Sequence, residues 1–77
     1  MRLVREIAHP ECKITIFSWN NRYLIKLEQG LLEQTFKLPE TELTGDDDLL
    51  SILDAEFLHQ ASQRFRDMGQ SLYEARR

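Results

Sequence analysis

The sequence has few of the residues that cross-link small secreted proteins, and no segment suited to crossing a membrane. Cys12 is the only cysteine among 77 residues, so no disulfide can form within the chain. No apolar stretch is long enough to span a bilayer, and the charged segment 1–6 lacks the apolar run of a signal peptide. These absences predict a cytoplasmic protein without membrane association.

Basic charge is also scarce, and the usual catalytic motifs are missing. Ten basic residues against 13 acidic ones give a net charge of −3, which disfavours nucleic acid as the main partner. The three glycines stand far apart, so no glycine-rich phosphate loop exists, and no serine lies in a recognisable Ser/His/Asp motif. The sequence therefore predicts no catalytic residues, no cofactor and no enzymatic activity.

The composition is that of an ordinary globular chain, with 42% hydrophobic and 30% charged residues. Seventy-seven residues allow one small domain, residues 1–77, whose core buries only a modest share of its surface. Small chains add stability through disulfides, metals or self-association. With a disulfide excluded and no metal-ligand spacing evident, self-association is the remaining candidate.

The central part of the sequence alternates as two antiparallel strands would. Ile14 and Ile16 occupy alternate positions that point to one face of a strand, while Phe17 and Trp19 point to the other face. Asparagine tolerates positive φ, so Asn20 and Asn21 form a plausible two-residue turn. This turn sets Trp19 opposite Arg22, Phe17 opposite Leu24 and Ile16 opposite Ile25. One face thus becomes apolar, and the other carries the aromatic residues.

Charge pairing suggests the registers of two further strands. A turn at Gln29 and Gly30 places Lys26 opposite Glu33, whereas a turn at residues 30–31 would set Glu28 against Glu33. The first register is therefore preferred, with the strand over residues 31–38. Upstream, residues 3–7 could form a strand joined by a loop at residues 8–11, with Glu6 opposite Lys13. That pairing leaves Arg5 on the apolar face, so whether residues 2–7 form a paired strand is open.

Beyond Pro39 the pattern becomes helical. Thr44 with Asp47 fits a capping box before an apolar pair, and the acidic run 46–48 suits a helix start. Asp54 either caps a second helix or marks a kink in one continuous helix. The predicted fold is α+β, with an antiparallel meander of three to four strands within residues 2–38. One face is packed by a C-terminal helix, preceded by a short helix, within residues 45–75.

A heptad-like stripe is the most regular feature of the C-terminal segment. Its members recur at spacings of three and four residues: Leu58, Ala61, Phe65, Met68, Leu72 and Ala75. One interpretation is that the stripe covers the chain's own sheet. The other is that its far end pairs with the same helix of a second chain, and both can hold together.

The second apolar feature is the sheet face opposite the core. One helical layer covers one face of a small sheet, so the aromatic face remains open to a partner or carries scattered exposed apolar residues. The predicted interaction surface combines this face with the far helix stripe: Phe17, Trp19, Arg22, Leu24, Met68 and Leu72. The predicted function is a small protein–protein interaction or adaptor-type domain that forms a homodimer or binds another protein.

The segment His9-Pro10-Glu11-Cys12 supports an alternative function. A His-x-x-Cys pair can contribute two metal ligands or line a small-ligand site. Two ligands do not complete a metal site, however, and a surface turn explains the same residues. We therefore expect no metal, and small-ligand binding at this turn remains the alternative to protein binding.

Overall fold

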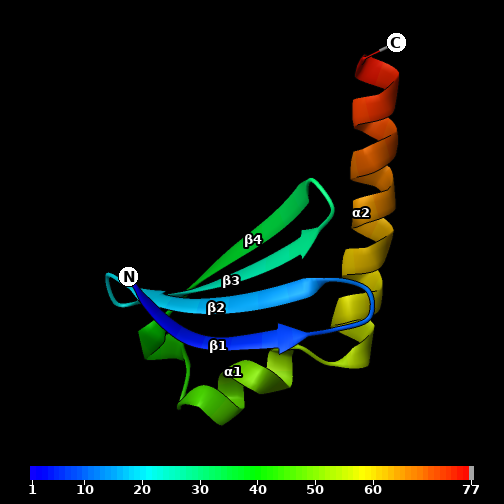
Figure 1. The fold of residues 1–77 in the computed structure, drawn as a ribbon. Coiled ribbons are helices and arrows are strands. Elements are labelled where there is room, and N and C mark those ends of the chain that lie inside the picture. The colour runs from blue at the N-terminus through cyan, green and yellow to red at the C-terminus, as the bar shows by residue number, and fades with distance from the viewer. Residues whose placement is uncertain (77) are drawn as a thin grey trace.

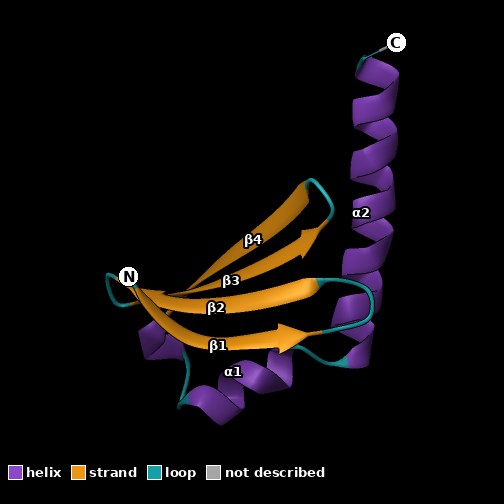
Figure 2. Ribbon diagram, viewed as in Figure 1, coloured by secondary structure: helices purple, strands orange, loops and turns teal. Residues whose placement is uncertain are grey.

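The computed structural model describes residues 1–76 as a curved four-stranded sheet flanked by helices (Figures 1 and 2). In chain order the elements are β1 (Arg2–Ala8), β2 (Lys13–Trp19), β3 (Arg22–Gln29), β4 (Leu32–Pro39), the single 3₁₀ turn η1 (Glu40–Glu42), α1 (Asp46–Ile52) and α2 (Ala55–Ala75). The strands are all antiparallel neighbours in the order β1-β2-β3-β4. The predicted α+β meander with a C-terminal helix is confirmed.

The β2–β3 hairpin forms as predicted. Asn20 and Asn21 both have positive φ, 51° and 60°, as a two-residue type I′ turn requires. Trp19 faces Arg22, and Ile16 faces Ile25. The predicted division of the sheet into an apolar face and an aromatic face follows from this register.

The predicted register of β3 and β4 is wrong by two residues. The turn lies at Gly30 and Leu31, so Glu28 faces Glu33 and Gln29 faces Leu32. Gly30 has φ +60°, which glycine adopts without strain at the first central position of a tight hairpin turn. Leu31 projects fully into solvent at the tip. In this register Gly30 occupies the first central position of the turn, where the backbone needs a positive φ.

The first strand exists, but its predicted register is also wrong by two residues. His9 and Cys12 exchange backbone hydrogen bonds of 3.2 Å each, so the loop is only Pro10 and Glu11. Ile7 consequently faces Ile14 rather than Cys12. The register shifts between Leu3 and Arg5, which is a β-bulge at Val4. Because of the bulge, Val4 packs against the core while Arg5 remains exposed.

The core lies between the apolar sheet face and both helices. Its fully buried members come from two strands and two helices: Ile14, Ile16, Ile25, Leu27, Leu49, Ala61 and Phe65. The predicted apolar face of the central hairpin is therefore confirmed. The short helix α1 contributes Leu49 to this core, so it covers the same face as α2.

Two separate helices follow the sheet, with Leu53 and Asp54 between them. Of the two alternatives for Asp54, the cap of a second helix is the one observed, because its carboxylate accepts a hydrogen bond from the Phe57 N–H at 2.8 Å. The predicted cap of α1 is wrong. Gly45 occupies the N-cap, and the Thr44 N–H instead donates to the Asp48 carboxylate at 3.2 Å.

Polar and aromatic contacts attach α2 to β4. The Gln34 amide donates to the Ala61 carbonyl and accepts from Arg64 Nε, each at 2.9 Å. Phe36 packs against Phe57 with ring centroids 5.3 Å apart, and the Arg64 guanidinium lies 5.8 Å from the Phe36 ring centroid. No helix in residues 1–76 combines the length and apolar character needed to cross a bilayer.

Candidate functional site

The outer part of α2 continues an apolar row beyond the sheet that the row covers. Ala61 and Phe65 are buried in the core, and Met68 is half-buried against it. One turn further along the helix, Leu72 is 48% exposed, and Ala75 is also exposed. Figure 1 shows α2 rising well past the β3–β4 hairpin. The near half of the predicted stripe packs internally, whereas the far half has no partner within residues 1–76.

Gly69 is the position on α2 that lies beside the tip of the β3–β4 hairpin, where contact with the sheet ends. A Cβ at this position would lie 3.7 Å from Leu32 Cδ1, at the end of the β3–β4 hairpin. Residues 70–76 are all exposed. The length of the hairpin, set by its turn at Gly30 and Leu31, therefore determines how much of α2 is uncovered.

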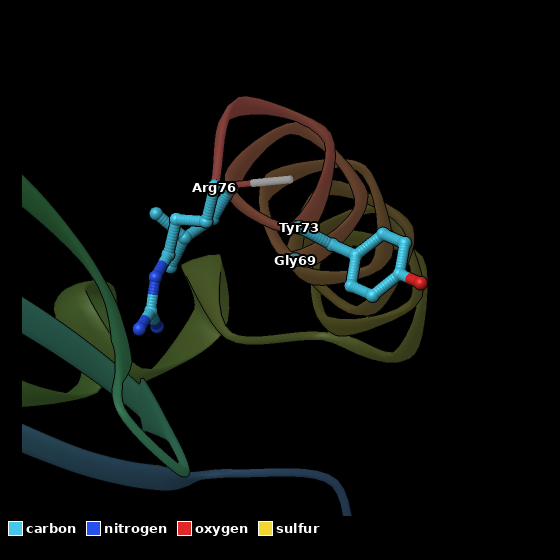
Figure 3. A pocket seen from close by; sticks show the side chains of 4 residues that line it. Gly69, Tyr73 and Arg76 are labelled. Carbon is cyan, nitrogen blue, oxygen red and sulfur yellow. The ribbon is translucent and has the colours of Figure 1, made fainter.

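A shallow hollow of about 500 Å³ lies on this uncovered part of the helix. It is lined by Gly69, Leu72, Tyr73 and Arg76, which have the spacing i, i+3, i+4 and i+7 of one helix face. Arg76 extends toward the side on which the hairpin lies, and Tyr73 projects away from it (Figure 3). Gly69 has no side chain, so the hollow has backbone as its floor. Tyr73, which is 69% exposed, adds a large apolar ring to the predicted surface.

The open sheet face forms a second apolar surface. Cross-strand neighbours Leu3, Phe17 and Leu24 make a continuous row across β1, β2 and β3. Leu24 is buried at 9% exposure even though it lies on this face, while Trp19 is 44% exposed. The residues of the predicted surface on this face are thus Phe17, Trp19, Arg22 and Leu24, with Leu3 as an addition.

Charges on the open face are unevenly distributed. Its carboxylates are in ion pairs: Glu6 lies 3.4 Å from Lys13 Nζ, and Glu28 and Glu33 lie 3.9 and 3.6 Å from Lys26 Nζ. At the apolar end, Arg22 and Lys37 have no carboxylate partner within residues 1–76. The aromatic end of the face therefore carries uncompensated positive charge.

The two parts of the predicted surface do not join. Trp19 and Arg22 flank the Asn20–Asn21 turn, which lies at the end of the sheet farthest from α2 (Figure 1). Met68 and Leu72 belong to the helix at the other end. The structure thus contains two separate candidate surfaces, and the helix surface includes Gly69, Tyr73 and Arg76, which the heptad pattern did not select.

The turn from His9 to Cys12 is closed and tightly hydrogen-bonded. Besides the two backbone bonds, the Glu11 N–H donates to His9 Nδ1 at 3.1 Å. Partial burial, and to a lesser degree the Glu11 charge, raise the pKa of the Cys12 thiol. A raised pKa makes this thiol a poor nucleophile near neutral pH. Within the part of the chain that the structure describes, no three His, Cys, Asp or Glu residues converge as metal ligands.

No protein-family model, curated protein or solved structure matches this chain. Functional arguments for it therefore depend on the geometry of the two apolar surfaces and of the turn that contains His9.

Proposed function

We propose that this chain is a small protein–protein interaction module that self-associates along the uncovered outer part of α2. The observation that supports the proposal is the 48% exposure of Leu72, which continues the row of the buried Ala61 and Phe65 beyond the sheet. Tyr73, which is 69% exposed, lies beside this row. The apolar face of an amphipathic helix normally extends only as far as the surface that the helix packs against. Here the apolar face continues, as expected if a second surface covers it.

A second copy is the occupant that fits this surface best. Two copies related by a twofold axis each contribute the same residues, so every buried side chain counts twice. Full burial of a leucine contributes about 1.5–3 kcal/mol, and tyrosine is enriched in interface cores. The hollow lined by Gly69 and Leu72 can receive an apolar side chain of the partner helix. A chain with a small core also gains stability from such pairing.

Light scattering over a wide concentration range tests the proposal. We expect a mass that rises toward twice the chain mass, and Leu72→Glu should abolish this rise because it buries charge in the interface. Leu31→Glu is the matched control, since Leu31 is a fully exposed leucine at the hairpin tip. Circular dichroism should show both variants folded. A monomer at every concentration, or a dimer unaffected by Leu72→Glu, would contradict the proposal.

The open sheet face is the second surface of the proposed module, and it suits a different protein. Its apolar end combines Trp19 and Phe17 with Arg22 and Lys37, whose charges are unpaired within residues 1–76. A partner segment with apolar side chains and flanking carboxylates is complementary to this arrangement. Trp19 is the only tryptophan, so its fluorescence reports on this face alone.

The two surfaces can be distinguished by that fluorescence. If α2 mediates self-association, Trp19 emission should stay constant across the concentrations at which the mass doubles. An acidic amphipathic peptide, added to the dimer, should shift the emission to shorter wavelength as Trp19 is buried. A shift on dimerisation alone would instead assign self-association to the sheet face.

A further inference from the structure

The β1–β2 turn and the first half of α2 enclose a cleft that neither apolar surface includes. Its volume is about 250 Å³. It is lined by residues from both elements: His9, Glu11, Ala55, Leu58, His59, Ser62 and Arg66. Figure 1 shows the β1–β2 connection passing beside the lower half of α2. The only two histidines of the chain, far apart in sequence, thus line one cleft.

A hydrogen bond to the His9 ring determines which of its two nitrogens carries the proton. The Glu11 N–H donates to His9 Nδ1 at 3.1 Å, so Nδ1 is an acceptor and the neutral ring carries its proton on Nε2. The two backbone bonds between His9 and Cys12 hold the turn that carries this ring. His9 therefore offers an N–H donor from a constrained position.

The helix side of the cleft adds further donors. His59, Ser62 and Arg66 follow one another at spacings of three and four residues, so they lie along one flank of α2. Arg66 is exposed, and within residues 1–76 it has no carboxylate within ion-pair distance. Its planar guanidinium can donate two parallel hydrogen bonds to one oxyanion.

The cleft is lined by few acidic residues. On α2, Glu56 accepts a hydrogen bond from Gln60 at 3.0 Å, and neither Glu56 nor Asp67, which follows Arg66 in the chain, lines the cleft. Among the residues that line the cleft, Glu11 is the one carboxylate, against one arginine and two imidazoles. The cleft therefore has an excess of donors and of groups that can carry positive charge.

We propose that this cleft binds an oxyanion, such as the phosphate group of a small molecule. Arg66 supplies the bidentate contact, the imidazoles of His9 and His59 supply N–H donors, and Ser62 supplies a hydroxyl. Donors on two different elements suit a tetrahedral anion, which accepts from several directions, better than a planar carboxylate. This site is independent of the proposed self-association, because Leu72 and Tyr73 do not line the cleft.

Nuclear magnetic resonance of the two imidazoles tests the proposal directly. Because both histidines line the cleft, their ring signals report on it without background from other histidines. Inorganic phosphate should shift both signals in a saturable manner, and sodium chloride at equal ionic strength should not. Acetate is the second probe: stronger saturation by acetate than by phosphate would assign the site to carboxylates. Shifts that never saturate, or that chloride reproduces, would overturn the proposal.

Two substitutions complete the test. Arg66→Gln should weaken phosphate binding about tenfold or more, because it removes the charged bidentate donor. Arg5→Gln is the matched control, since Arg5 is an exposed arginine on β1 that does not line the cleft. Glu11→Gln should instead tighten binding, because it removes the opposing charge, an effect that a purely structural role would not produce. Equal affinity in Arg66→Gln and the unmodified chain would contradict the proposal.

Discussion

Gln34 Nε2 donates a hydrogen bond of 2.9 Å to the main-chain oxygen of Ala61, and this bond joins β4 to the buried face of α2. The other end of the same amide accepts from Arg64 Nε, so one side chain satisfies partners on both sides. The bond is partly buried, where an unpaired polar group is costly. Gln34 therefore attaches α2 to β4 at the level of Ala61.

Gln34→Ala should lower the free energy of unfolding by about 1–3 kcal/mol, because it removes a partly buried hydrogen bond between two elements. Gln70→Ala is the matched control. Gln70 also donates from Nε2, but to Glu74 on the exposed surface of the same helix, where such a pair contributes about 0.2–0.5 kcal/mol. Chemical denaturation measures both. Equal losses in the two variants would show that Gln34 does not anchor the helix.

Two leucines near one turn should differ strongly in their response to the same substitution. Leu27 is 0% exposed in the core, and Leu31 is 103% exposed at the hairpin tip. Leu27→Ala should destabilise by about 2–5 kcal/mol through loss of burial and a residual cavity. Leu31→Ala should change stability by less than about 0.5 kcal/mol. Equal losses of stability in the two variants would contradict the burial of Leu27.

Glycine-to-alanine substitutions should have opposite signs at two positions. Gly30 has φ +60°, so alanine there is strained by about 1–2 kcal/mol. Gly69 lies inside α2, and an added Cβ would make an ordinary contact of 3.7 Å with Leu32. Gly69→Ala should stabilise by up to about 1 kcal/mol through helix propensity. Thermal unfolding compares them, and a stabilising Gly30→Ala would refute the turn assigned here.

Cys12 should react slowly with iodoacetamide at neutral pH. Partial burial, and secondarily the Glu11 charge, raise its pKa in the folded chain. The midpoint of the rate-against-pH profile should lie above that of the unfolded chain, and Glu11→Gln should move it partly back. A midpoint below the unfolded value would contradict the burial.

The same raised pKa of Cys12 has a consequence for stability. Below the pKa of the unfolded thiol, both states hold the proton, and the contribution of Cys12 is fully present. As the pH rises through the folded pKa, this contribution is lost, because the unfolded state releases its proton first. Stability should therefore fall as the solution becomes alkaline, and less steeply in Cys12→Ala.

The faces of the sheet were predictable, whereas two of the three registers were not. The alternation of apolar residues in β2 and β3 decides which side is buried, and Ile16 and Ile25 lie there as predicted. A shift of two residues keeps every side chain on its face, so the apolar pattern does not distinguish such registers. Both wrong registers differ from the structure by two residues.

Charge pairing did not resolve this ambiguity, because long side chains reach diagonally. Lys26 was expected directly opposite Glu33, yet it faces Thr35 and still lies 3.6 Å from the Glu33 carboxylate. Lys13 likewise contacts Glu6 at 3.4 Å from a diagonal position. The ion pairs form as predicted, but both registers permit them, so they carry no information about register.

A signal that does fix the registers was present in the spacing of the turns. The two-residue loops begin at residues 10, 20 and 30. Pro10, Asn20 and Gly30 are each suited to the first central position of a tight turn. Regular strand length with these turn formers predicts all three hairpins together, whereas pairwise charge matching predicts only the central one.

The candidate sites were predictable to different extents. The exposed end of the helix stripe could be read from heptad spacing, because the stripe is longer than a small sheet can cover. The oxyanion cleft could not, since it depends on where the His9 turn meets α2 in three dimensions. The spacing of His59, Ser62 and Arg66 gives a single flank of a helix, but no sequence pattern connects that flank to residue 9.

The order of elements along the chain has a consequence for synthesis on the ribosome. The sheet is complete once Pro39 has emerged, yet Ala61 and Phe65, which cover its apolar face, follow roughly two dozen residues later. At a synthesis rate of about 5–20 residues per second, that face remains uncovered for about one to five seconds. During this interval the nascent sheet exposes Ile14, Ile16 and Ile25 to solvent or to a chaperone, so translation speed and chaperone supply should affect the yield of folded protein.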